Sequence, residues 1–81
     1  MIPRVIEARH TADYRVWLRF YDGLEGEIDL ATEIWGEVFE PVRDREYFAR
    51  VAVNSETGTI AWPNGADFAP EFLRERIRIA A

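Results

Sequence analysis

The sequence of 81 residues contains no cysteine and no lysine, and His10 is its only histidine. Without cysteine there is no disulfide, no thiolate nucleophile and no cysteine-based metal site. Without lysine there is no amine for Schiff-base chemistry or for a phosphate-binding loop. A lone histidine does not build a histidine-rich zinc site. We therefore expect no metal and no cofactor, and we interpret His10 as an ordinary residue near the end of a strand.

Long apolar runs are also missing. No segment approaches the ~20 apolar residues of a membrane span, and the N-terminus lacks the basic and apolar regions of a signal peptide. The net charge of −5 opposes electrostatic attraction to nucleic acid. We therefore expect a soluble cytoplasmic protein that binds neither a membrane nor, directly, a nucleic acid.

Hydrophobic and aromatic side chains are abundant. They make up 48% and 14% of the residues, which is enough apolar surface for one small core. This length predicts a single domain over residues 1–81. Small domains gain stability by oligomerising, so a homodimer through an open sheet edge or through Trp17 remains an alternative.

The first half of the chain predicts three strands. Their expected ranges are residues 2–10, 14–21 and 27–30. Alternation along the second strand turns one set of side chains to the core and the other to solvent. The core set is Tyr14, Val16, Leu18 and Phe20.

The turn between the second and third strands decides their register. A two-residue loop at Asp22-Gly23 would place Glu27 on the core face, because a slip of one residue reverses every side chain. We therefore predict a three-residue loop, 22–24, or a bulge with the same effect. This loop pairs Leu18 with Ile28 and sets Arg19 opposite Glu27.

The second half predicts short helices and a hairpin. We expect residues 37–39 to be extended or irregular and a helix over about 41–49, started by Pro41 or capped by Asp44. Strands 50–54 and 59–62 follow, joined by a turn, and then a helix from Pro70 to about Ile77, with a short strand over 76–79 as the alternative. Together these elements predict an α+β fold, a small antiparallel β-sheet built from hairpins with two short helices packed on it.

Aromatic and arginine side chains form the candidate binding surface. Arg15, Trp17 and Arg19 lie on the polar face of their strand, and aromatic residues and arginine are enriched in protein interfaces. Trp35 is added to this candidate partner surface. The alternative is that the protein's own loops or helix cover this face. The nearby acidic residues are interpreted as a solvated surface. They are Glu33, Glu37, Glu40, Asp44 and Glu46.

Catalytic arrangements are weakly represented. Ser55 lies in a predicted turn without a nucleophile-elbow pattern. An enzyme would need Asp67, His10 and an acid such as Asp29 to converge in one pocket. We instead expect Asp67 to accept hydrogen bonds from free backbone amides before the last helix. The prediction is that the protein is not an enzyme.

Several motifs, spread over nearly the whole chain, resemble one bacterial family. They are Phe20-Tyr21-Asp22-Gly23, Ile28-Asp29-Leu30, residues 39–44 with Tyr47-Phe48, residues 58–68 with their Trp-Pro-Asn-Gly-Ala-Asp segment, and Pro70-Glu71. The sequence resembles the domain-of-unknown-function family DUF 2442. It departs from the family pattern at Ala69, where serine often stands, and at Val42, where leucine is usual.

The resemblance implies a small α+β fold with no established activity and no known cofactor. It also implies that some longer relatives carry a DNA-binding helix-turn-helix, and that others are encoded beside a second small protein in a toxin–antitoxin-like pair. Our functional hypothesis is a non-catalytic protein-interaction module, such as an antitoxin-like partner of a second small protein. The alternative is a small-ligand-binding or regulatory sensor domain.

Overall fold

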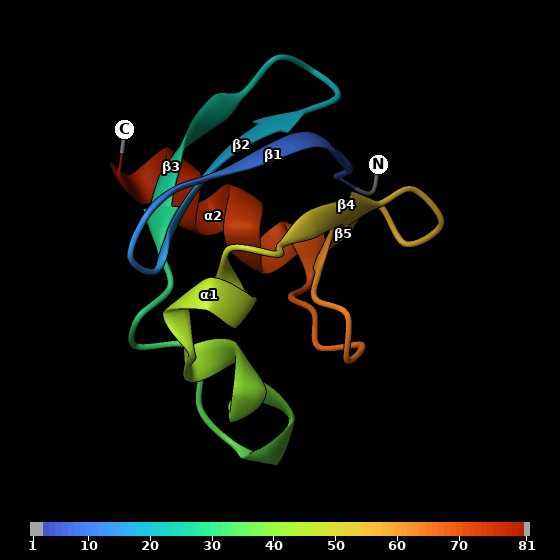
Figure 1. Ribbon diagram of the computed structural model, residues 1–81. Coiled ribbons are helices and arrows are strands. Elements are labelled where there is room, and N and C mark those ends of the chain that lie inside the picture. Colours follow the sequence, from blue (N-terminus) through green and yellow to red (C-terminus); the bar gives the residue numbers. More distant parts are fainter. Residues whose placement is uncertain (1–2, 81) are drawn as a thin grey trace.

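The chain forms two antiparallel sheets with one longer helix packed against them. The computed structural model describes residues 3–80, with side chains to residue 78. A three-stranded sheet has the order β1-β2-β3, and β4 pairs with β5 (Figure 1). The elements are β1 (Val5–Ala12), β2 (Arg15–Phe20), β3 (Glu25–Asp29), η1 (Glu37–Phe39), η2 (Pro41–Arg43), α1 (Arg45–Phe48), β4 (Ala52–Asn54), β5 (Thr59–Ala61) and α2 (Pro70–Ala80). The predicted α+β class is confirmed, although the hairpins form two sheets rather than one.

The three-stranded sheet buries three of the four side chains that alternation predicted, and the fourth, Tyr14, precedes β2 and is half-buried. Val16, Leu18 and Phe20 are fully buried, and α2 covers them from below with Leu73 and Ile77. The first strand begins at Val5 and ends at Ala12, later than predicted, and the predicted start at residue 2 lies outside the described residues.

The β2–β3 turn has the predicted length but not the predicted residues. Phe20 N–H donates to Leu24 O at 2.8 Å, so the loop consists of residues 21–23. Gly23 has φ of 95°, the left-handed conformation that closes a three-residue hairpin loop and that glycine adopts without strain. The predicted pairing of Leu18 with Ile28 is therefore wrong by two residues, and Val16 pairs with Ile28 instead. The faces are unchanged, because a shift of two preserves them.

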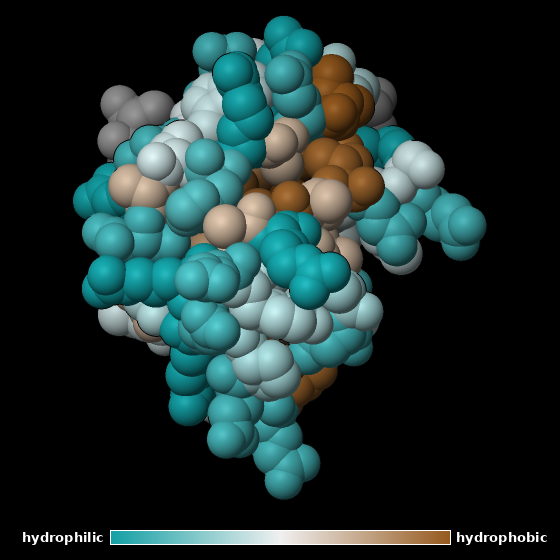
Figure 2. All heavy atoms as spheres, in the orientation of Figure 1, coloured by the Kyte–Doolittle hydropathy of each residue, from teal (hydrophilic) through white to brown (hydrophobic). Residues whose placement is uncertain are grey.

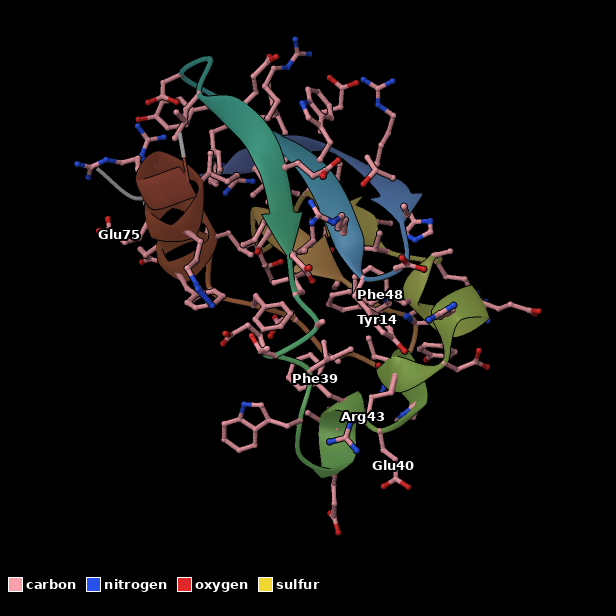
Figure 3. The ribbon with its side chains drawn as sticks, turned by 90° about the vertical axis from the view of Figure 1, so that its left-hand side faces the viewer. Tyr14, Phe39, Glu40, Arg43, Phe48 and Glu75 are labelled. Atoms are coloured by element: carbon pink, nitrogen blue, oxygen red, sulfur yellow. The ribbon has the colours of Figure 1, made fainter. Side chains whose placement is uncertain are left out.

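The segment after β3 turns around two buried side chains. Val42 and Phe48 are fully buried. Residues 37–39, for which an extended or irregular conformation was predicted, form the 3-10 helix η1. Asp44 caps α1 and accepts from Glu46 N at 3.1 Å. Figure 3 shows Phe48 beside Tyr14, and their rings meet edge to face at 5.3 Å.

The stretch after β5 is a structural turn. The Trp62 indole donates to Phe48 O at 2.9 Å in the core, and Gly65 has φ of 90°. Asn64 Oδ1 accepts from Ala66 N at 3.1 Å within this turn, and among the described residues no backbone amide donates to the Asp67 carboxylate as predicted. Asp67 itself is exposed and forms a backbone bridge with Ala61.

The last helix runs further than predicted. α2 continues to Ala80, so the alternative of a short strand over 76–79 is wrong. Its Arg74 makes two hydrogen bonds to Asp22 in the β2–β3 turn, at 3.0 and 2.6 Å. The surface seen in Figure 2 is mostly hydrophilic, with apolar side chains gathered over the start of β1 and over β4.

Candidate functional site

The uncovered face of the three-stranded sheet carries most of the predicted site. Arg15, Trp17 and Arg19 point to the side opposite α2, as their alternation with the buried residues of β2 requires. We call this side the outer face. Its members are Glu7, Arg9, Arg15, Trp17, Arg19, Glu25, Glu27 and Asp29. On this face Arg9, Arg15 and Arg19 are exposed and Trp17 is half-buried.

Carboxylates on the neighbouring strands already bind both arginines. Arg19 contacts Glu7 at 2.5 Å, and Arg15 contacts Glu27 at 2.8 Å and Asp29 at 3.9 Å. The predicted cross-strand pair of Arg19 with Glu27 does not form, because the register shift places Glu25 opposite Arg19. The outer face is thus a network of opposite charges rather than a basic patch.

Hydrogen bonding favours the ionised forms within this network. The bond from Arg15 lowers the pKa of Glu27 below its usual value, and Thr11 adds a second bond in the same direction. The same contact raises the pKa of Arg15. Both groups are exposed, so the pair adds little to stability, but it fixes the position of the Glu27 carboxylate.

Trp17 lies at the centre of this face. The guanidinium of Arg9 stacks over the indole at 4.6 Å from the ring centroid, a cation–π arrangement. A shallow hollow of about 360 Å³ lies beside it, lined by Arg9, His10, Thr11, Trp17 and Glu27. His10 is engaged elsewhere, because its Nε2 donates to Asp13 O at 2.9 Å and its ring packs on Phe48 at 5.7 Å.

Trp35 belongs to a different part of the molecule. It lies in residues 34–40, which we call the tip loop and which extends away from the sheet below α1 in Figure 1. Its side chain is 71% exposed, and Val38 in the same loop is 51% exposed. The structure therefore does not join Trp35 with the aromatic and arginine residues of β2.

Long-range hydrogen bonds hold the tip loop. Arg43 Nε donates to Ile34 O at 2.8 Å, and Asn64 Nδ2 donates to Val38 O at 2.8 Å. Ile34 is buried, and Phe39 stacks on Phe68 with ring centroids 5.0 Å apart. The loop is anchored in the core near both ends, while its two exposed apolar side chains face solvent.

The three residues that an enzyme would need in one pocket stay apart. His10 is on β1, Asp29 ends β3, and Asp67 follows β5. Within residues 3–80, no hydrogen bond or ion pair joins any two of them. The Asp29 carboxylate accepts from Ala31 N at 2.9 Å. Among the described residues, no group of three histidine or acidic side chains is arranged to hold a metal ion.

Two features of the surface were missed in the sequence. Arg9 was not connected to Trp17, although both are polar-face residues of neighbouring strands, because the register of β1 was not predicted. Val38 was expected in an extended or irregular segment, and its exposure beside Trp35 was not predicted. The run Gly-Glu-Val between two aromatic residues was the available signal of a turn that exposes its middle.

Comparisons with known proteins give one match. A family model described as "Protein of unknown function (DUF2442)" matches residues 5–78. Neither the curated proteins nor the solved structures contain a match. In residues 3–80 no helix is long and apolar enough to cross a membrane.

Proposed function

Since the chain belongs to the DUF2442 family, whose description carries no activity, we propose from its own geometry that it is a non-catalytic protein-interaction module. The observation that carries the proposal is the tip loop. It presents an exposed tryptophan on a backbone that is already fixed by contacts to the core.

Pre-organisation is what distinguishes Trp35 from an incidental surface residue. Scattered exposed apolar side chains are common and need no explanation. Here the hydrogen bonds from Arg43 and Asn64 fix the loop before binding, so a partner would not bear the entropy cost of ordering it. Tryptophan is also the residue type most enriched among binding hot spots.

The charges around the tip loop define the partner. Glu37 and Glu40 form no ion pair with any described residue, and Glu40 points away from the protein in Figure 3. A partner with an apolar pocket for Trp35 and basic residues at its rim would match this surface. In its finer form the proposal names a second small protein of a bacterial cytoplasm, for which this chain acts in an antitoxin-like role.

The test begins with co-expression of the chain and its genomic neighbour, followed by purification of the complex. Calorimetry then compares the affinity of the wild type with that of two variants. Trp35→Ala is expected to weaken binding by at least about 2 kcal/mol, or roughly 30-fold. Ile6→Ala is the control, because Ile6 is another exposed apolar side chain, 51% exposed, but lies on β1; the affinity of this variant should stay within about twofold of the wild type.

The possible results test the tip loop and the antitoxin-like role separately. Equal affinities of wild type and Trp35→Ala would refute the tip loop as the anchor. A neighbour that slows growth when expressed alone, and no longer does so with this chain, would support the antitoxin-like role. Trp35→Ala should fold normally, since its side chain is largely exposed, and circular dichroism checks this.

The second candidate function is small-ligand sensing at the hollow beside Trp17. The stacked Arg9 and the fixed Glu27 carboxylate would suit a planar ligand with both a donor and an anionic group. A metabolite screen by thermal shift tests it, with Trp17→Leu as the control that should abolish any stabilisation. A stabilisation that Trp17→Leu retains would contradict binding at this hollow.

A further inference from the structure

The outward edge of β3 has a regular row of unused backbone groups. The hydrogen bonds Phe20 N to Leu24 O and Leu30 N to Tyr14 O, both 2.8 Å, mark hydrogen-bonded pairs at either end of the β2–β3 ladder. Such pairs recur at every second residue. The backbone N–H and C=O groups of Gly26 and Ile28 therefore point towards β2. Those of the three acidic residues 25, 27 and 29 point outward.

No described residue occupies this edge. None of the three outward-facing residues makes a backbone hydrogen bond outside its own strand pairing within residues 3–80. Figure 3 is turned so that this side of the sheet faces the viewer, and no other segment crosses in front of β3. An unpaired strand edge is a template for another strand.

The two edges of the sheet differ in regularity. β1 shows two register shifts against β2 and contacts both β4 and β5. β3 pairs with β2 from residue 25 to residue 29 without a shift. Bulges and covering elements are the usual means of blocking an edge, and among the described residues only the β1 edge has them.

Charge selects what this edge accepts. Glu25, Glu27 and Asp29 carry their carboxylates on one face, and Arg15, which pairs with two of them, leaves this group of charges net negative. In an antiparallel pairing with a second copy centred on Glu27, that residue would face itself and Glu25 would face Asp29. Like charges directly opposite each other are destabilising, so the edge disfavours self-association and favours a strand with arginine or lysine at alternate positions.

The covered face of the sheet adds a second requirement. α2 runs beneath β3, where Ile77 lies against Gly26, and its C-terminal end projects beyond β3 in Figure 1. In an added strand, the side chains that alternate with the basic ones would lie on the same side of the sheet as this helix. We therefore expect those side chains to be apolar.

We infer that β3 binds an extended segment of a partner protein as a fourth strand, with basic residues alternating with apolar ones. Main-chain hydrogen bonds to residues 25, 27 and 29 would provide the register, and the carboxylates would provide the selectivity. This surface is separate from the tip loop, so either can exist without the other.

A synthetic peptide that alternates arginine and valine is the probe. It is titrated into the full-length ¹⁵N-labelled protein while amide shifts and hydrogen exchange are followed by NMR. At saturation the amides of Glu25, Glu27 and Asp29 should exchange at least about tenfold more slowly. A peptide with glutamate in place of arginine should bind at least about tenfold more weakly. Unchanged exchange at these three amides would overturn the inference.

Backbone pairing is tested separately from charge. Glu27→Gln removes one carboxylate but keeps the outward N–H, so binding should weaken only a few-fold. Glu27→Pro removes that N–H without touching the β2 ladder and should abolish binding. If Glu27→Pro fails to fold, a peptide N-methylated at the positions that face β3 makes the same test on unaltered protein. An N-methylated peptide that binds as tightly as its parent would refute strand addition.

The same peptide is finally titrated into Trp35→Ala. Retained affinity is expected, because the tip loop contributes nothing to the β3 edge. A loss of affinity of about tenfold or more would contradict the assignment of the peptide to β3.

Discussion

Substituting Gly26 by alanine tests the packing of α2 beneath the sheet. A Cβ built on Gly26 would lie 2.9 Å from Ile77 Cγ2, closer than real contacts allow. Ile77 is 1% exposed and is held in the core, so it has little room to move. Gly26→Ala must therefore push the helix and the strand apart.

Two opposing effects set the size of the change. Overpacking of a well-packed site costs about 1–3 kcal/mol, whereas replacing glycine at an ordinary backbone conformation gains about 0.4–1 kcal/mol by restricting the unfolded chain. We expect a net loss of about 1–2 kcal/mol in the free energy of unfolding. Ile77→Ala alone should cost about 2–5 kcal/mol because it leaves a cavity.

Urea unfolding of the four members of a double-mutant cycle measures this coupling. In the Gly26→Ala/Ile77→Ala double variant the new methyl group enters the space left by isoleucine, so the loss should be smaller than the sum of the single losses by about 1 kcal/mol or more. Glu25→Ala, on the outer face of the same strand, is the control and should change stability by less than about 0.5 kcal/mol. Strict additivity, or a Gly26→Ala variant as stable as the wild type, would refute the close packing of α2 on β3.

Three further predictions concern single contacts. Trp62→Phe removes the indole donor to Phe48 O and leaves a void, so calorimetry should show a loss of about 1–3 kcal/mol; an unchanged melting temperature would contradict the buried bond. Asp44→Ala removes a helix cap and should cost about 0.5–2 kcal/mol in urea unfolding, whereas a neutral result would contradict the cap. The hydrogen bond from Arg74 lowers the pKa of Asp22 below its ordinary 3.8. The stability that this pair contributes is therefore fully present above pH 3.8, and it is lost as the pH falls through the lower pKa of the folded protein. The free energy of unfolding of Asp22→Asn should therefore fall less steeply at acidic pH than that of the wild type. Parallel pH curves for the wild type and the variant would argue against this pair.

Local patterns in the sequence predicted much of the fold. Alternation in β2 identified Val16, Leu18 and Phe20 as core residues. Asp44 was one of two predicted helix starts, because capping depends on only three or four consecutive residues, and the structure confirms the cap. The register of β3 could not be predicted in the same way. Loops of 22–24 and 21–23 satisfy the same alternation, and the choice depends on which loop position requires a left-handed residue, which here is Gly23.

The candidate site shows the same division. Alternation correctly placed Arg15, Trp17 and Arg19 on one exposed face, because side chains two residues apart on a strand share a side. Which carboxylates neutralise those arginines depended on the register, so Arg15 rather than Arg19 binds Glu27. Arg74 likewise bonds to Asp22, 52 residues away in sequence, rather than to Glu71 on its own helix.

The sequence by itself determined the family, the α+β class and the side of each strand that is buried, since these depend on composition and on periodicities of a few residues. Tertiary structure alone decided that Trp35 stands apart from Trp17 on a loop fixed by Arg43 and Asn64, and that no described residue pairs with the outward edge of β3. These features depend on contacts between residues far apart in the chain. The order of residue types along the sequence does not by itself specify which of the many compatible contacts form.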